Sequence, residues 1–205
     1  MADEEGGARR GRKYEQVLEG ARAIFVRDGF EGASVDDVAR EAQVSKATLY
    51  SYFPDKRLLF AEVARDKCRR ATERALMLIN MADPPDRVLP EAARQLIDFL
   101  LSDIGRAIFR IAVAEAERFP DIARQFYDCG HAAVRDALVG YLRGAAARGE
   151  VKIDDFDLAA DQFAELCKAQ IVLPVALGIM SDVAPADRER IGAAAVETFL
   201  ARYGA

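Results

Sequence analysis

The segment from Ser34 to Phe53, SVDDVAREAQVSKATLYSYF, constrains the fold of this chain more than any other. Its hydrophobic spacing predicts two short helices, each preceded by a serine, with a turn of about three residues between them. Ser34 followed by Asp37 resembles a capping box in which Asp replaces the usual Glu or Gln. Ser45 is the N-cap candidate of the second helix. The segment therefore predicts a helix-turn-helix pair.

The second of these helices carries small and hydrogen-bonding side chains outside its apolar side. Leu49 and Phe53 return to the interior, and the free N–H groups near Ser45 favour a phosphate or a base-edge acceptor. Lys46 could reach guanine or phosphate, and Thr48 a phosphate or a thymine methyl group. This pattern is typical of a helix that lies in a DNA major groove. The predicted contacts are Ser45, Lys46, Ala47, Thr48, Tyr50, Ser51 and Tyr52, with Lys56 at the DNA backbone.

A longer helix is predicted before this pair, from about Arg12 to Arg27, with one apolar stripe and an end at Asp28-Gly29. Helices this short close a small core only together, so we expect a three-helix module. Arg9, Arg10, Arg12 and Lys13 form a basic arm beside the first helix that could neutralise phosphates. Two alternatives stay open: the arm is a solvated tail, or the short helices belong to an ordinary helical domain.

The run from Gly29 to Phe60, GFEGASVDDVAREAQVSKATLYSYFPDKRLLF, resembles the N-terminal signature of the TetR family of transcriptional regulators. The resemblance implies a two-fold dimer with an N-terminal DNA reader and a C-terminal ligand-sensing domain. Two positions depart from the pattern: Gln43 replaces the usual turn glycine and should adopt an unusual backbone conformation, and Ser51 stands where Arg or His is frequent. Carried over by position, the residues that touch DNA are Ser34, Lys46, Thr48, Tyr50, Tyr52 and Lys56.

The net charge of −5 is at first sight wrong for a DNA-binding protein. The excess of acidic side chains lies in residues 75–205, whereas residues 1–74 are close to balance. No apolar run reaches the length of a membrane span, and the N-terminus lacks the apolar core of a signal peptide, so we expect a cytoplasmic protein. Cys68, Cys129 and Cys167 stand far apart with a single histidine, His131, so we expect no metal and no cofactor.

The rest of the chain reads as helix, and the whole is predicted to be all-α without a sheet. Residues 1–55 are expected to form the helix-turn-helix DNA-binding domain and residues 56–205 a helical effector-binding and dimerisation domain. A clear break is expected at Asp83-Pro84-Pro85-Asp86. The helices predicted beyond the module are about 55–80, 87–102, 103–118, 121–147 and 156–180, and a last one from Pro185.

The two last helices predict the dimer. The helix from Phe156 to Met180 is apolar nearly all round after Leu166, so it needs a second covering surface, and Pro174 should kink it. Small residues in the last helix allow close helix approach. A plain monomer core is the alternative. The residues predicted at the dimer interface are Leu166, Val172, Val175, Ala195 and Phe199.

The resemblance also implies an effector cavity among the central helices. The stretch ERFPDIARQFYDCG is similar to regulators with an AefR-like C-terminal domain. We expect a repressor that a small, mostly hydrophobic effector releases from DNA, although aromatic residues of this kind more often belong to a core than to a cavity. The candidate lining residues are Phe99, Phe109, Arg110, Phe126, Tyr127, Phe163 and Cys167, with Glu115 as a further polar group.

Two other classes of protein compete with this interpretation. An all-helical enzyme has little support, because the sequence shows no Cys/His or Ser/His arrangement and no glycine-rich phosphate loop. A dimeric helical interaction protein that has lost DNA binding is favoured somewhat by Gln43 and Ser51. We therefore expect a DNA-binding regulator and not an enzyme.

Overall fold

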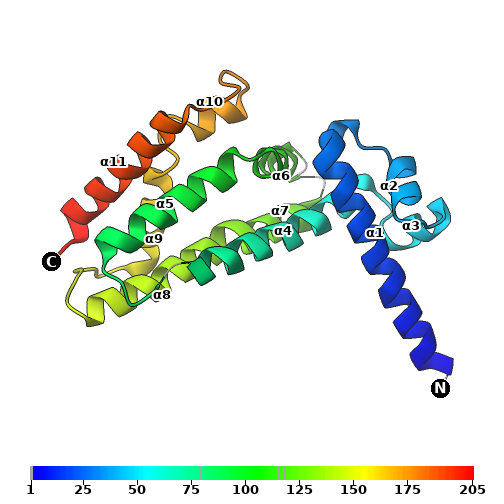
Figure 1. Ribbon diagram of the computed structural model, residues 1–205, viewed down its shortest axis with the longest axis horizontal. Coiled ribbons are helices and arrows are strands. Elements are labelled where there is room, and N and C mark those ends of the chain that lie inside the picture. Colours follow the sequence, from blue (N-terminus) through cyan, green and yellow to red (C-terminus); the bar gives the residue numbers. More distant parts are fainter. Residues whose placement is uncertain (1, 79, 115, 118) are drawn as a thin grey trace. The chain divides into compact units, whose positions relative to one another are not determined.

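The computed structural model describes residues 2–78, 80–114, 116–117 and 119–205, and among them the side chains outside 2–10, 68, 71–78 and 122. The described part of the chain is helical and contains no strand, only one antiparallel bridge between Val151 and Gly204, which confirms the all-α prediction. The elements (Figure 1) are α1 (Ala2–Gly32), α2 (Val35–Glu41), α3 (Lys46–Tyr52), α4 (Lys56–Leu78), α5 (Pro85–Leu101), α6 (Asp103–Ala114), α7 (Pro120–Phe126), the π-helical turn η1 (Tyr127–Ala132), α8 (Ala133–Ala147), α9 (Phe156–Leu166), α10 (Val172–Ala176) and α11 (Pro185–Tyr203).

The chain divides into two compact units. The N-terminal unit holds residues 1–67 and 110–126, and the C-terminal unit holds residues 68–109 and 127–205. The N-terminal unit thus contains α1 to α3 and the first half of α4, together with the end of α6 and all of α7. Residues that follow α5 in the chain therefore pack in the same unit as the helix-turn-helix pair.

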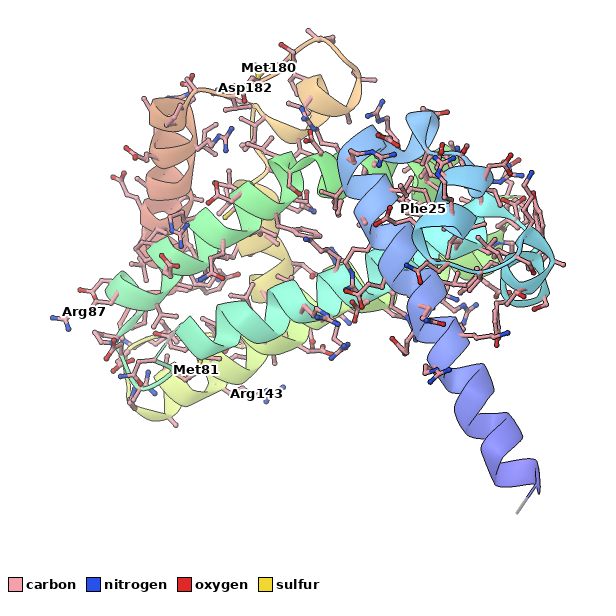
Figure 2. The ribbon with its side chains drawn as sticks, turned by 45° about the vertical axis from the view of Figure 1, so that its right-hand side comes forward. Phe25, Met81, Arg87, Arg143, Met180 and Asp182 are labelled. Atoms are coloured by element: carbon pink, nitrogen blue, oxygen red, sulfur yellow. The ribbon has the colours of Figure 1, made fainter. Side chains whose placement is uncertain are left out.

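The core of the N-terminal unit is built on the apolar stripe of α1. Val17, Ala21 and Ile24 are almost completely buried in it. Phe25, labelled in Figure 2, lies on the same stripe and is also buried. The other helices of the unit supply Val38, Ala39, Leu49, Leu59, Phe60 and Val63. Residues from all four helices meet in this core, so each helix depends on the others for its burial.

The crossing of α1 and α2 depends on Gly20. A Cβ atom at this position would lie 2.7 Å from the backbone nitrogen of Ala42, closer than any side chain allows. Glycine is therefore the residue that lets α2 approach α1 this closely.

Two details of α1 differ from the sequence prediction. The helix begins at Ala2 rather than near Arg12, so the predicted start was wrong. Gly29 has a positive φ of 70° and interrupts the helix where the sequence predicted its end, although helical residues resume as far as Gly32. Of the predicted basic arm, Arg12 and Lys13 are exposed on α1, whereas the side chains of Arg9 and Arg10 lie outside the described residues.

The C-terminal unit has a second, larger core. Within it α11 lies along α5, and α9 packs against α8 (Figure 1). Phe163 of α9 and Phe199 of α11 meet edge to face, with ring centroids 5.4 Å apart. Gly192 of α11 is buried toward Ala93 and Ile97 of α5, and a Cβ atom added there would meet both side chains at ordinary contact distance. Of the small residues that the sequence places in the last helix, Gly192 and Ala195 are therefore buried, whereas Ala193 and Ala194 are exposed.

The segment 156–180 is not the single kinked helix that was predicted. It is α9 and the short α10, separated by a turn in which Gln170 has a positive φ of 66°. Pro174 lies inside α10 and cannot supply a backbone donor there, which limits helix formation around it. Met180 and Asp182 lie in the segment that leads from α10 to α11 (Figure 2). The break predicted at residues 83–86 is present, but α5 begins within it, at Pro85 rather than near Arg87. The predicted start of the last helix at Pro185 is confirmed.

Candidate nucleic-acid interface

The start of α2 is fixed by Ser34, as predicted. Its hydroxyl oxygen accepts a hydrogen bond from the backbone N–H of Asp37 at 3.0 Å and donates one to the Asp37 carboxylate at 2.5 Å. The hydrogen bond from Ser34 lowers the pKa of Asp37, and Arg40 nearby lowers it further. The carboxylate thus stays charged at the positive end of the helix dipole, which stabilises α2.

The helix α3 begins with a second serine cap. The hydroxyl oxygen of Ser45 accepts from the backbone N–H of Thr48 at 3.1 Å and lies 2.8 Å from the Thr48 hydroxyl. Leu49 is buried, and the N–H of Phe53 closes the helix on the Leu49 carbonyl. The opposite side of α3 is open to solvent, with Lys46, Ala47, Tyr50 and Ser51 exposed.

The turn between α2 and α3 has the strained conformation that the sequence predicted. Gln43 has a positive φ of 53°, which costs a non-glycine residue roughly 1–2 kcal/mol. Its N–H donates to the Arg40 carbonyl at 3.1 Å, and the Val44 N–H donates to the Ala39 carbonyl at 3.0 Å. The turn backbone is therefore satisfied within the motif, which holds α3 at a fixed angle to α2.

Lys46 is held by α2. Its ammonium lies 2.6 Å from the Asp36 carboxylate, and this hydrogen bond raises the pKa of Lys46. Both side chains are more than half exposed, so water screens their attraction and a phosphate oxygen can replace Asp36. Asp36 was not singled out by the sequence analysis, because it lies on the preceding helix and only the angle between the two helices brings it to Lys46.

Two hydroxyl groups on α3 already have intramolecular partners. The Ser51 hydroxyl donates to the Thr48 carbonyl at 2.7 Å, and the Thr48 hydroxyl lies beside Ser45. Tyr52 is half-buried, with its ring edge-on to Tyr14 of α1 at 5.7 Å. Burial raises the pKa of the Tyr14 hydroxyl to about 12, and a hydrogen bond with Glu62 contributes to this rise to a smaller extent. Tyr50 is the large aromatic side chain that α3 turns outward, 48% exposed.

Lys56, predicted at the DNA backbone, lies against the turn between α1 and α2. Its ammonium donates to the Phe30 carbonyl at 2.7 Å and to the Ala33 carbonyl at 3.0 Å. It also lies 4.4 Å from the centre of the Phe30 ring. Its neighbour Arg57 has its guanidinium 4.8 Å from the ring of Phe119, the residue that precedes α7. Sequence reasoning missed both roles, since no local pattern links residue 56 to 30 or 57 to 119.

The candidate effector residues are divided between the two compact units. Arg110 and Phe126 belong to the N-terminal unit, and the five others belong to the C-terminal unit. Phe163 and Cys167 are fully buried in the core, and burial raises the pKa of the Cys167 thiol to about 12. Glu115 lies outside the described residues. Phe99 is half-buried, whereas Phe109 and Tyr127 are exposed.

The candidate dimer residues fall into two groups. Ala195 and Phe199 are buried in the core of the C-terminal unit. Leu166, Val172 and Val175 are half-buried. Beside them the structure exposes apolar side chains that the sequence analysis did not single out, at Leu173, Leu177 and Ile179.

The structure offers little for other kinds of site. Among the residues whose side chains are described, no group of His, Cys, Asp or Glu could hold a metal ion. No helix within the described ranges is long and apolar enough to cross a bilayer. The side chain of Cys68 lies outside the described residues.

The geometry of α1 to α4 defines a class of protein. The serine-capped α3 packs on α2 and α1 and presents a lysine and a tyrosine outward, which is the arrangement of a helix-turn-helix DNA-binding module. The model of bacterial regulatory proteins of the tetR family matches residues 17–63, and that of the AefR-like transcriptional repressor C-terminal domain matches residues 87–205. The chain belongs to the TetR family of transcriptional regulators, with a C-terminal domain of the AefR-like type.

Individual relatives agree with this assignment. The HTH-type transcriptional repressor AcnR of Corynebacterium diphtheriae is 36% identical over 61 residues, 30% of this chain and 32% of AcnR, so the match spans about a third of that repressor. The regulator UidR of Escherichia coli is 22% identical over 184 residues, 85% of this chain and 83% of UidR.

Solved structures extend the likeness to the whole chain. A TetR-family regulator from Mesorhizobium loti has a TM-score of 0.83 at 28% identity, covering 96% of this chain and 99% of its own. The flavonoid-responsive regulator FrrA has a TM-score of 0.71 at 34% identity, covering 95% and 98%. The protein is thus a DNA-binding transcriptional regulator.

Proposed function

We propose that this regulator is a repressor that leaves its operator when a small, mostly hydrophobic effector binds the domain formed by residues 56–205. The observation that carries the DNA-binding part is the outward face of α3, where Lys46, Ala47, Tyr50 and Ser51 are exposed on a helix capped by Ser45. Side chains of this kind reach phosphates and base edges in a major groove. Ser34 and Tyr52 set the position of that face, and Thr48 lies beside its cap.

Two comparisons support the repressor and effector parts of the proposal. The C-terminal domain is of the type described as that of an AefR-like transcriptional repressor. The relative FrrA, 34% identical over nearly the whole chain, is a flavonoid-responsive regulator. We therefore propose an effector that is similar in size to a flavonoid and, like a flavonoid, carries ring systems. It must bind the conformation that does not fit DNA more tightly than the one that does, because equal affinity shifts no equilibrium.

We further propose that the regulator works as a homodimer. A helix-turn-helix module contacts few bases, and two modules reach half-sites about 34–36 Å apart, or multiples of that distance. Leu166, Val172 and Val175 remain the proposed interface, widened by the exposed Leu173 and by its neighbours Leu177 and Ile179. We propose that Ala195 and Phe199 support this surface from within the core.

The proposal also covers the mode of action, the location of the protein and the division of the chain. We propose that the chain acts by binding alone, without a catalytic step, cofactor or metal, and in the cytoplasm where its operator would lie. The proposed functional division stays at residues 1–55 for reading DNA and 56–205 for effector binding and dimerisation. Candidate lining residues for the effector remain Phe99, Phe109, Arg110, Phe126, Tyr127, Phe163 and Cys167.

The proposal is tested with the DNA upstream of the gene. An inverted repeat found there is placed in a labelled duplex, and its binding is followed by gel shift with and without a panel of small aromatic and aliphatic compounds, flavonoids included. We expect a protein–DNA complex that at least one compound dissociates. The same compound should raise the thermal unfolding midpoint of the protein in the absence of DNA. A stable complex that no compound affects would remove the effector part and leave the DNA-binding part intact.

A further inference from the structure

Lys56 is the first residue of α4. Its side chain turns back onto residues 29–34, which run from the interruption of α1 at Gly29 to the N-cap of α2 and form the turn between α1 and α2. The ammonium donates to the carbonyls of Phe30 at 2.7 Å and Ala33 at 3.0 Å. It also lies 4.4 Å from the centre of the Phe30 ring, a distance at which the ring attracts a cation. Three contacts from one side chain thus converge on a single turn.

These contacts leave Lys56 little capacity for DNA. A lysine ammonium has three N–H donors, and the two carbonyls take two of them. The side chain is half-buried, so its charge is already directed toward protein atoms. By contrast, the ammonium of Lys46 is exposed on α3 and held only by an exposed carboxylate. The two lysines therefore have different chemistry, although both occupy positions where the resemblance implies DNA contact.

The turn that Lys56 holds determines where the reading helix lies. Gly29, with its positive φ, interrupts α1, and the Ala33 N–H donates back to the Gly29 carbonyl at 3.2 Å. Ser34, the next residue, is the N-cap of α2. The turn is thus followed directly by the helix that carries α3, so a shift of the turn moves both helices of the motif.

The ring of Phe30 also packs against other aromatic rings of α1 and α4. It lies 5.0 Å from the ring of Phe60, one turn further along α4, and 6.1 Å from the ring of Phe25 on α1. Phe25 and Phe60 meet edge to face at 5.0 Å. The start of α4 therefore contacts Phe30 in two ways: Lys56 donates a hydrogen bond to the Phe30 carbonyl, and the Phe60 ring packs against the Phe30 ring.

We propose that Lys56 is a positioning residue, which joins the first turn of α4 to the turn between α1 and α2 and so sets the orientation of α3 toward DNA, without a phosphate contact of its own. The inference rests on the DNA-binding function of the chain and assigns a role to one residue within it. A compact ammonium fits between two converging carbonyls, whereas the planar guanidinium of arginine directs its donors in a different geometry.

Full-length Lys56→Arg and Lys56→Gln are compared with the wild type by fluorescence titration of a random-sequence duplex over a salt series. Both should weaken binding several-fold at every salt concentration and leave the slope of log affinity against log salt unchanged. Amide hydrogen exchange should accelerate in residues 29–34 of both variants, while the core of the C-terminal unit keeps its protection. Lys46→Gln is the positive control, for which the slope should fall by about 0.9.

Lys67→Gln is the matched negative control, because Lys67 is exposed on the same helix and its loss removes the same charge. It should change neither the exchange nor the slope. A slope that falls by about 0.9 in Lys56→Gln, with full binding restored in Lys56→Arg, would show a phosphate contact and overturn the proposal. Unchanged affinity in both Lys56 variants would overturn it as well. Failure of wild-type protein to bind any duplex would instead contradict the proposed function itself.

Discussion

Asp36 and Lys46 form the pair that most directly links a single residue to DNA affinity. The carboxylate lies 2.6 Å from the ammonium and would face the phosphates of a bound duplex. We expect Asp36→Asn to raise affinity for random duplex DNA several-fold at low salt, because it frees Lys46 and removes a negative charge from the interface. Fluorescence titration measures the change, with Asp103→Asn, an exposed aspartate far along the chain, as control. Equal affinity in wild type and variant would argue against α3 as the reading helix.

Tyr141 predicts how stability depends on alkaline pH. Its ring is buried, its hydroxyl donates to the Asp83 carbonyl at 2.9 Å, and burial raises its pKa to about 12. A phenol whose pKa is raised in the folded state stabilises the protein fully below its ordinary value of 10.0 and loses that contribution as pH rises toward about 12. Chemical unfolding at pH 8 and at pH 11 should show a smaller loss for Tyr141→Phe than for wild type. If wild type and Tyr141→Phe lost equal unfolding free energy between pH 8 and pH 11, the Tyr141 phenol would be exposed to water, contrary to this prediction.

Among the helices, the crossing of α1 and α2 makes the sharpest prediction. Alanine at Gly20 gains up to about 1 kcal/mol of helix propensity, but its Cβ would lie 2.7 Å from the Ala42 backbone nitrogen. Overpacking of this kind costs about 1–3 kcal/mol, so we expect Gly20→Ala to destabilise the protein and weaken DNA binding together. Gly140→Ala, whose added Cβ meets no atom of the described residues within 4 Å, should be neutral or stabilising. Thermal unfolding compares the two, and a stabilised Gly20→Ala would refute the close crossing.

Local features of the helices were predictable because their causes lie within a few residues. The serine caps and the strained Gln43 follow from neighbouring sequence, and the structure confirms them. Gly29 interrupts α1 where the sequence predicted its end, but the helix runs on to Gly32. The contacts of Lys56 with residues 30 and 33, and of Arg57 with Phe119, arise from packing between distant segments, which no local pattern encodes. The division of 156–180 into α9 and α10 was missed because apolar composition alone does not show where a helix ends.

For the molecule as a whole, the exposed apolar surface around α10 predicts association. Leu173, Leu177 and Ile179 are 68%, 65% and 78% exposed, more than a monomer usually leaves uncovered in one short segment. We expect the wild type to sediment as a dimer at micromolar concentration and the double variant Leu173→Glu, Ile179→Glu to sediment as a monomer. Val26→Glu, which places the same charge on an exposed valine of α1, should leave the dimer intact. Dimeric behaviour of the double variant would move the interface elsewhere.

We propose that α3 binds duplex DNA through an exposed face held by α1, α2 and α4. The most direct measurement is the affinity of wild-type protein for a labelled random duplex as a function of salt concentration. We expect binding at low ionic strength, with a steep fall of log affinity against log salt that becomes shallower by about 0.9 in Lys46→Gln. A wild-type protein with no affinity for duplex DNA at low salt, or a slope that Lys46→Gln leaves unchanged, would contradict the account.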